Sequence, residues 1–459
     1  MEKRSKMVLS DQNIGRLLAK LSLPAIAGML VMSLYNVVDA IFIGQSVGIL
    51  GIAGIAIAFP IQMIVGAVGQ MIGIGGASLL SRSLGAKNMD TANQILGNVI
   101  ASVLLLSVPI SCFGLLGIND LLRWFGATPS IMPYAKDYLL YILIGITFHS
   151  MAMALNNLVR AEGKAKIAMT TMILSSVINI ILDAYFIFGL KMGIRGAAIA
   201  TLIAYFSGFV FLLTYYLSGK SVLRLRLGDI GFQWNIQRQI IAIGISAFIR
   251  QAAMSLLVII LNNSLAHHGG DIAIAVYGVV MRLIWLLFTP ILGISQGLQP
   301  IIGFNYGAKN YKKAKESVLL ATIVATLISI IGTVVILLFP ETLLGIFSKD
   351  EMLLQQGRTA LRYIILAFPL MGFHVIGITL FQAIGKAVQT FILTLSRQFI
   401  FLIPLVLILP GFFQLTGIWI SFPIADMLSA IMTLLMMIPL KNHYLKKMKI
   451  LTEEFHESS

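Results

Sequence analysis

Long apolar segments constrain the fold of this chain more than any other feature. With 58% hydrophobic and 11% charged residues, the 459-residue sequence could not cover a water-soluble surface. Runs of about 20 or more mostly apolar residues recur along it, and each can cross a hydrocarbon layer of about 30 Å. The twelve expected membrane segments are residues 21–43, 51–80, 92–117, 138–159, 167–190, 196–217, 240–265, 272–302, 316–339, 361–382, 390–409 and 416–439.

Backbone groups inside lipid must be hydrogen-bonded within their own segment, so we expect all twelve segments to be helices. Residues 1–20 are polar and basic. We expect segment 21–43 to be kept as the first membrane helix, because it is too long for a signal peptide and carries Asp39. The single cysteine, Cys112, excludes an intrachain disulfide and a cysteine-cluster metal site.

The net charge of +15 is distributed unevenly along the chain. Of the 33 lysines and arginines, 24 fall in the tails and in alternate loops, and 7 fall in the loops between them. The positive-inside rule then predicts a multi-pass protein of the cell (inner) membrane with both termini in the cytoplasm. Anionic lipid headgroups, rather than nucleic acid, are the expected partner of this charge.

Several short sequences recur at a constant offset of 222 residues. Residues 85–88 (Gly-Ala-Lys-Asn) return as residues 307–310, and residues 163–165 (Gly-Lys-Ala) return as residues 385–387. An even number of helices separates the copies, which therefore share one orientation, as in parallel-repeat transporters. We expect an all-α membrane protein with two six-helix lobes, in the order residues 1–217 (first lobe), 218–238 (cytoplasmic linker), 239–445 (second lobe) and 446–459 (cytoplasmic tail).

The repeated Gly-Ala-Lys-Asn segment is expected to be a turn in which the glycine takes a positive φ and ends a helix. It does not match the phosphate-binding P-loop pattern, which occurs nowhere in the chain. We therefore expect no nucleotide cofactor, and an ion gradient as the energy source for any uphill transport.

Of the eighteen acidic residues, three lie deep inside apolar segments: Asp39, Asp183 and Asp426. A charge at the bilayer centre costs about 2.5–3.5 kcal/mol on insertion scales, so such residues usually carry function. Asp426 has no acidic neighbour in sequence. It is either a second protonation site or the partner of a buried arginine such as Arg250 or Arg282.

Polar companions accompany the other two aspartates at helical spacing. Asn179 lies four residues before Asp183, and Tyr35 lies four residues before Asp39, so each pair shares one helix face. Counting residues from the expected helix ends places both aspartates and Thr201 in the outer half of the bilayer.

Two carboxylates held together in a low dielectric cannot both stay charged without a proton or a cation. A sodium ion would suit the oxygens of Asp39, Asp183, Asn179 and Thr201 with a backbone carbonyl near Ala197, because hard cations prefer oxygen ligands. The sequence leaves the choice between H⁺ and Na⁺ open. The alternative is a static hydrogen-bond network between helices.

Short motifs in a fixed order run through the chain. They are Pro24 with residues 36–39 (Asn-Val-Val-Asp), residues 160–163 (Arg-Ala-Glu-Gly), Asn179 with Asp183, residues 196–198 with Thr201, residues 296–300 (Gln-Gly-Leu-Gln-Pro), residues 305–308 and residues 395–398. Over essentially the full length, the chain resembles the multidrug and toxic compound extrusion (MATE) family, in the branch of the DinF-like and MepA-like transporters.

The resemblance implies two lobes around a central cavity, and export of organic cations and amphipathic drugs against H⁺ or Na⁺ entry. It implies a cation site in the first lobe at Asp39, Asn179, Asp183 and Thr201, joined by an asparagine of the fourth helix, Asn156 or Asn157. We expect the substrate to meet the same region, at Tyr35, Asn36, Asp39 and Asp183.

The sequence-based hypothesis is thus a monomeric multidrug efflux antiporter that works by alternating access and contributes to antibiotic resistance. The alternative is a flippase for lipids or lipid-linked sugars, which would need a cavity lined by several cationic residues, for which Arg250, Arg282 and Arg397 are candidates. An enzyme is not expected, because the sequence shows no nucleophile–base pair or metal-ligand cluster.

Overall fold

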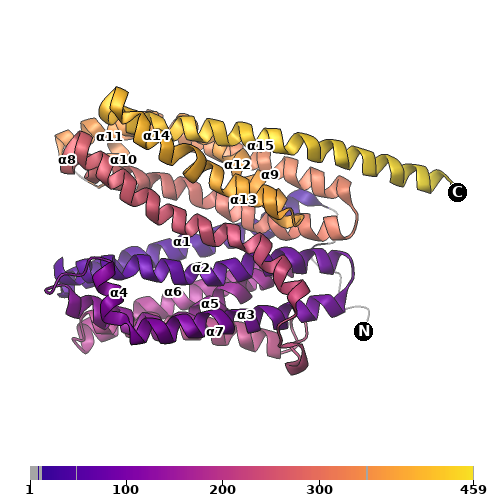
Figure 1. The fold of residues 1–459 in the computed structure, drawn as a ribbon, viewed down its shortest axis with the longest axis horizontal. Helices are drawn as coiled ribbons and strands as arrows, with labels where there is room; N and C mark the ends of the chain where they lie inside the picture. The colour runs from indigo at the N-terminus through magenta and orange to yellow at the C-terminus, as the bar shows by residue number, and fades with distance from the viewer. Residues whose placement is uncertain (1–8, 10–12, 48, 348–349, 458–459) are drawn as a thin grey trace.

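The computed structural model of the chain is a stack of long helices in two groups (Figure 1). It describes residue 9 and residues 13–47, 49–347 and 350–457, and these ranges contain no strand. The elements are α1 (Ile14–Val47), α2 (Ile49–Gly85), α3 (Met89–Leu116), α4 (Ile118–Trp124), α5 (Met132–Ala161), α6 (Ala165–Asp183), η3 (Ala184–Gly189), α7 (Ile194–Leu217), η4 (Leu227–Asp229), α8 (Trp234–Gly307), α9 (Tyr311–Leu338), α10 (Pro340–Gly345), α11 (Glu351–Ile364), α12 (Phe368–Ala383), α13 (Ala387–Leu395), η5 (Ser396–Leu402), α14 (Ile403–Ile408) and α15 (Pro410–Glu457).

The described part of the chain holds 11 helices long and apolar enough to cross a membrane, or 12 if the bent pair α11 and α12 is one span. The α8 helix supplies two of these spans, which meet at Gly270, where φ is 66°. The prediction of an all-α membrane fold is confirmed. The tenth span differs from the straight segment expected at residues 361–382, because it bends by 50° just before Pro369. Proline cannot continue the hydrogen bonding of a preceding helix.

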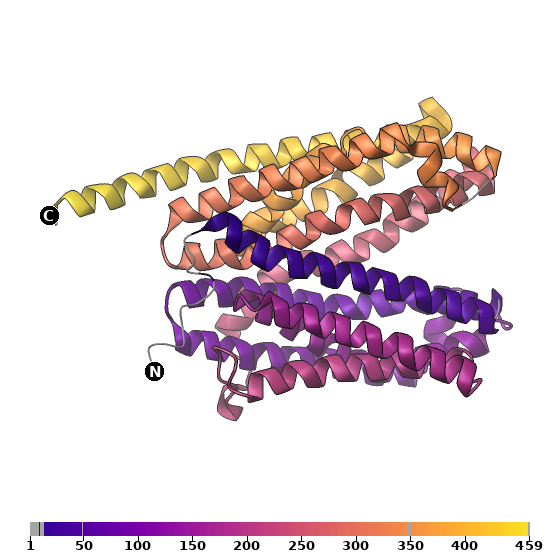
Figure 2. The ribbon, with the colours of Figure 1, turned by 180° about the vertical axis from the view of Figure 1, so that it is seen from behind.

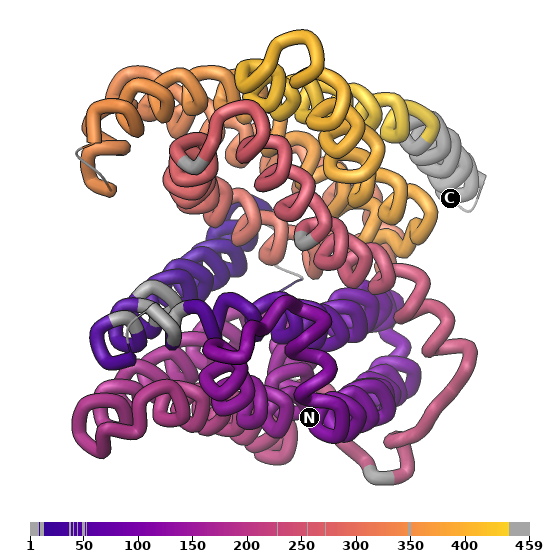
Figure 3. Tube along the Cα trace, turned by 60° about the vertical axis from the view of Figure 1, so that its left-hand side comes forward, coloured from indigo at the N-terminus to yellow at the C-terminus, as the bar shows by residue number. Residues whose placement is uncertain are grey.

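The two groups of helices follow the two halves of the sequence. Helices α1 to α7 form one group and α8 to α15 the other, and the view from behind shows α1 running along the boundary (Figures 1 and 2). The tube in Figure 3 shows the same two groups from a third side. The short helices α4 and α10, which the sequence did not suggest, begin at Ile118 and Pro340, again 222 residues apart.

Helix α1 belongs to both groups. Its first part contributes Leu17 and Leu21 to the same buried apolar cluster as Leu298 and Trp419 of the second group. Its later part packs along α6 of the first group. Movement of one group of helices relative to the other would therefore strain α1.

The repeated Gly-Ala-Lys-Asn turns have the same conformation in both halves. Asn88 accepts a hydrogen bond from the backbone of Thr91 and caps α3, and Asn310 does the same for α9. The residue with positive φ is the lysine, at 58° for Lys87 and 59° for Lys309. The prediction that the glycine of this turn takes the positive φ is therefore wrong.

The physical reason is that the two glycines remain helical and let the two halves touch. A Cβ on Gly85 would overlap the carbonyl of Phe304, and a Cβ on Gly307 would overlap the carbonyl of Arg82. Phe304 lies three residues before Gly307, and Arg82 lies three residues before Gly85. The contact is thus reciprocal between the two halves.

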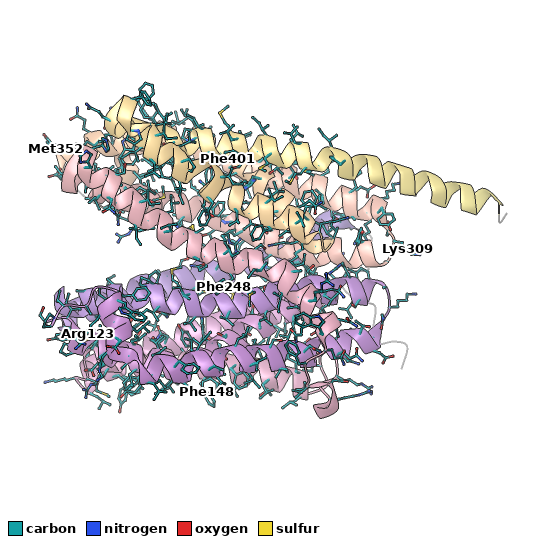
Figure 4. All side chains as sticks on the ribbon, in the orientation of Figure 1. Arg123, Phe148, Phe248, Lys309, Met352 and Phe401 are labelled. Atoms are coloured by element: carbon teal, nitrogen blue, oxygen red, sulfur yellow. The ribbon has the colours of Figure 1, made fainter. Side chains whose placement is uncertain are left out.

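The end of the molecule with these turns is called the basic end here, and the opposite end the far end. Figure 4 labels Lys309 at the basic end and Arg123 and Met352 at the far end. Further close contacts between the halves lie on the basic side of the helices: Gly75 on the Ile240 carbonyl, Gly244 on the Met71 carbonyl, and a hydrogen bond from the Ser78 hydroxyl to the Gln382 carbonyl. The two halves are therefore tightly closed at the basic end.

The connection between the halves is fastened to the first group. The Glu162 carboxylate accepts hydrogen bonds from the Ser221 hydroxyl (2.8 Å) and the Val222 backbone (3.1 Å). The Asn98 side chain accepts one from the Gln233 backbone at 2.7 Å. Helix α8 begins at Trp234, so the last five residues of the expected linker 218–238 are helical.

Candidate functional site

The carboxyl groups of Asp39 on α1 and Asp183 at the end of α6 lie close enough to interact directly with each other. Asp183 is fully buried. Among the described residues, no hydrogen-bond donor reaches Oδ1 of Asp39 or either carboxylate oxygen of Asp183. Two acids in contact, without donors, can be stabilised by a shared proton or by a bound cation.

Asn179 and Thr201 extend this pair of acids. Asn179 lies one helical turn before Asp183 on α6, and its amide nitrogen donates to the Thr201 hydroxyl on α7 at 3.3 Å. Both side chains are buried, and the amide oxygen of Asn179 has no donor among the described residues. Helical spacing and the packing of α6 on α7 thus bring together the polar groups that the sequence singled out.

Ala197 lies one layer beyond the acids. It is fully buried in a small apolar cluster with Ile43 and Ile187. Each isoleucine follows one of the two aspartates by four residues, so this cluster forms the next layer toward the far end. The chain switches to the π-helical segment η3 directly after Asp183, and such segments often occur at functional sites.

Three tyrosines surround the acids. Tyr35 and Tyr138 interact electrostatically with both carboxyl groups, and Tyr205 interacts with Asp39. The Tyr205 hydroxyl accepts a hydrogen bond from the Gln62 side chain at 2.6 Å. Only Tyr35 was expected from the sequence. Tyr205 could have been found from its position four residues after Thr201, whereas Tyr138 on α5 has no such signal.

Asn156 does not join the acids. Its amide nitrogen donates to the Ala168 carbonyl near the start of α6, and its oxygen accepts from Arg160. Asp183 lies 15 residues further along α6, a rise of about 22 Å. Asn157 also binds Arg160 and so stays at the same level. The side chain of Asn36, the remaining residue of the expected substrate contact, lies outside the described residues.

A cavity with about 1030 Å³ of empty space, counted up to its open mouth, lies beside the acids. Its wall follows α6 from Thr171 to Asn179 and includes Thr201 of α7. Four methionines contribute to the wall, and such soft, flexible side chains adapt to ligands of different shape. The methionines are Met29, Met32, Met153 and Met172.

The cavity wall also contains polar residues that were not predicted to line it. Gln70, His149 and Arg160 line it from the first half, and Gln296 of α8 lines it from the second half. The three arginines proposed for a flippase cavity, Arg250, Arg282 and Arg397, are not among the described lining residues. Instead, Arg160 is the cationic side chain in this wall.

Asp426 forms a buried ion pair, as one of the two sequence-based alternatives predicted, but with another partner. Its carboxylate accepts a hydrogen bond from the Arg397 guanidinium at 2.6 Å, and its side chain is 2% exposed. The prediction that Arg250 or Arg282 pairs with Asp426 is therefore wrong. Arg397 lies on the π-helical segment η5, which turns it toward α15.

Comparison with known proteins agrees with this architecture. The MatE family profile matches residues 24–185 and 246–408, one match in each half. The multidrug export protein MepA of Staphylococcus saprophyticus is 27% identical over 423 residues, which cover 92% of this chain and 93% of MepA. MepA of Staphylococcus haemolyticus is 27% identical over 442 residues, 96% of this chain and 97% of its own length.

Solved structures show the same fold. The MATE multidrug transporter DinF-BH is 45% identical with a TM-score of 0.87 and covers 94% of this chain and 96% of its own. An outward-facing MATE multidrug resistance transporter is 27% identical with a TM-score of 0.91, over 96% and 99% of the two chains. With both halves matched by one family profile, the chain belongs to the MatE family, the multidrug and toxic compound extrusion transporters.

Proposed function

We propose that this protein exports amphipathic organic cations and related drug-like molecules in exchange for H⁺ or Na⁺. The observation that carries the proposal is the contact between the carboxyl groups of Asp39 and Asp183, whose buried oxygens lack donors among the described residues. The names of MepA as a multidrug export protein and of DinF-BH as a multidrug transporter support the export of drugs in this proposal.

In this proposal the acids bind either a cation from outside or the positive charge of a substrate. Asn179 and Thr201 line the cavity that would hold the substrate, and Asn179 lies one helical turn before Asp183. These two residues therefore lie between the position of the substrate and the position of the cation. Exchange requires that the cation and the substrate stabilise different conformations of the transporter. Helix α1 is suited to couple them, because it carries Asp39 and packs against both groups of helices.

We assign the basic end to the cytoplasm, because membrane proteins carry excess lysine and arginine on that side. Both termini then lie in the cytoplasm of a cell-membrane protein that works as a monomer. The closed basic end corresponds to an outward-facing state. Entry of substrate from the cytoplasm would require the two halves to separate there.

The test is dye and drug efflux in proteoliposomes with an imposed Na⁺ or H⁺ gradient. The parent protein is compared with Asp39→Asn, Asp183→Asn and the control Asp137→Asn, whose carboxylate pairs with Arg195 on the surface. We expect the first two variants to lose gradient-driven efflux and the control to keep it. Undiminished efflux by both site variants would refute the proposed site, and the effective gradient identifies the coupling ion.

A further inference from the structure

Arg160 is a buried cation with no acidic partner among the described residues. Its side chain lies at the end of α5 and is 8% exposed, and the four described ion pairs involve other residues. The guanidinium donates to the side-chain oxygens of Asn156 and Asn157. Neutral amides and the partial negative charge of a helix end satisfy its hydrogen bonds but do not cancel a full charge.

The nearest acid in sequence, Glu162, is used elsewhere. Its Oε2 accepts hydrogen bonds from Tyr215, Ser221 and Val222, which fasten the connection between the halves, and no described ion pair joins its carboxylate, whose Oε1 is buried without a donor, to Arg160. Glu162 is 1% exposed. The positive charge of Arg160 is therefore left facing the cavities that it lines.

Arg160 lies between two of these cavities. It lines the large cavity in the first half and a smaller chamber with Gln296 and Gln299 of α8. The side-chain nitrogen of Gln299 is a buried donor without an acceptor among the described residues. The amide nitrogen of Gln296 contacts the sulfur of Met29, a weak acceptor, so rotation of this amide would offer a further donor. Donors thus converge on one place from both halves.

We propose that Arg160 recognises an anionic group, such as a carboxylate, on the amphipathic molecules that enter this cavity. Asn179 borders the acids eight residues beyond Thr171 on α6, a rise of about 12 Å. A cation thus lies in the cavity wall at the basic end, and the acids lie behind Asn179 and Thr201 of the wall toward the far end. Such a cavity selects zwitterionic ligands, because each end repels the like charge of a reversed ligand.

This inference rests on the proposed export of amphipathic molecules, but a binding assay separates the two. A rhodamine ester, which is a cation, is compared with the corresponding rhodamine acid, which is a zwitterion. Fluorescence polarisation measures the binding of both to the purified protein in lipid nanodiscs, in chloride and in gluconate buffer. The variants are Arg160→Met, Arg160→Lys and the control Arg282→Met, which removes an exposed arginine of α8.

We expect Arg160→Met to weaken binding of the acid about tenfold or more while the ester changes little, because hydrogen bonds to charged groups are the strong ones. Arg160→Lys should keep part of the preference, and Arg282→Met all of it. If chloride strengthens ester binding in the parent but not in Arg160→Met, a free anion occupies the site. If Arg160→Met weakens binding of the acid equally in chloride and in gluconate, the site binds the carboxylate of the ligand itself.

Equal effects of Arg160→Met on acid and ester would overturn the inference, as would a parent protein that fails to bind the acid. If Arg160→Met does not fold, Arg160→Lys takes its place. Equal preference for the acid over the ester in the parent and in Arg160→Lys, together with indifference of both dyes to chloride, then contradicts the anion site. Failure of the parent to transport either dye would count against the export function, while the binding ratio still reports on Arg160.

Discussion

Asn179 on α6 donates from its amide nitrogen to the hydroxyl of Thr201 on α7 at 3.3 Å. This hydrogen bond joins the two helices, yet it leaves the amide oxygen of Asn179 buried without a donor among the described residues. Purely structural asparagines usually satisfy both ends of the amide, because an unmet buried polar atom costs about 1–3 kcal/mol. Such an oxygen one turn before Asp183 is suited to bind a cation.

Removal of the side-chain oxygen of Asn179 or of Thr201 should weaken the coupling of efflux to the cation gradient. We expect Asn179→Leu and Thr201→Val each to lower the apparent cation affinity about tenfold, the scale of one charged hydrogen bond. Efflux measured against cation concentration in proteoliposomes gives this affinity. The matched control is Thr214→Val, since Thr214 is exposed on the same helix and bonds to the Val210 carbonyl. An unchanged affinity in both site variants would assign the pair to helix packing.

Neutralising one acid should stabilise the protein against heat in a buffer without sodium. Asp183→Asn removes the need of the two acids for a shared proton or cation, and we expect the free energy of unfolding to rise by about 1–3 kcal/mol. If Na⁺ is the coupling ion, sodium should raise the unfolding temperature of the parent by mass action and leave Asp183→Asn unchanged. Thermal unfolding in nanodiscs measures both effects. A variant that is less stable than the parent in both buffers would contradict this expectation.

Filling the contact between the halves should open the basic end. The added methyl group of Gly85→Ala would meet the Phe304 carbonyl. Spin labels on Lys87 and Lys309, in a Cys112→Ser background, should then move apart, and Gly278→Ala should leave their distance unchanged because nothing described lies within 4 Å of its added Cβ. Electron paramagnetic resonance measures this distance. Identical distance distributions for parent and Gly85→Ala would show that the contact does not control closure.

The buried pair of Arg397 and Asp426 should act on stability rather than on coupling. Breaking it with Asp426→Leu leaves an unpaired buried cation, and we expect a loss of about 3–5 kcal/mol. The double variant Asp426→Leu/Arg397→Met should recover most of this loss and keep gradient-driven efflux. Chemical unfolding and the efflux assay test the two parts. A stable double variant without coupled efflux would instead make Asp426 a second protonation site.

Glu162 should make the stability of the protein depend on pH. Burial raises the pKa of Glu162 above its ordinary value of 4.5, although hydrogen bonds from Ser221 and Val222 oppose the change. Stability is therefore greatest below the unfolded-state pKa and falls as the pH rises toward the folded-state pKa. Glu162→Gln should flatten this fall, whereas the exposed control Glu341→Gln should not. Thermal unfolding between about pH 4 and 8 measures this dependence of stability on pH. If stability falls equally with pH in the parent, Glu162→Gln and Glu341→Gln, Glu162 is not its cause.

Much of the fold follows from the sequence because the lipid environment leaves few alternatives. Hydrophobic length determines the spans, and the constant offset of 222 residues predicts two copies in one orientation. The spacing of Asn179 and Asp183 predicts that they share a face, since four residues make about one helical turn. The spans and the shared face depend on neighbours within a single helix, and the repeat is visible by comparing the two halves of the chain.

The remaining features depend on how helices pack, which spacing along one helix does not contain. Tyr138 reaches the acids from α5, and Arg397 finds Asp426 through a π-helical turn that places it toward α15. Asn156 is held one turn from Arg160 by a bond on its own helix, away from the acids. Lys87 takes the positive φ because the neighbouring glycine is needed for contact between the halves.

The reciprocal contact at the basic end has a bearing on ancestry. Gly85 meets Phe304 and Gly307 meets Arg82, and each residue of one contact is the 222-residue counterpart of a residue in the other. A two-fold dimer of a single six-helix subunit has this geometry, since one patch then faces its own copy. After fusion of the two subunits, each copy could mutate separately. Arg82 and Phe304 occupy matching places and already differ, in charge as well as in size.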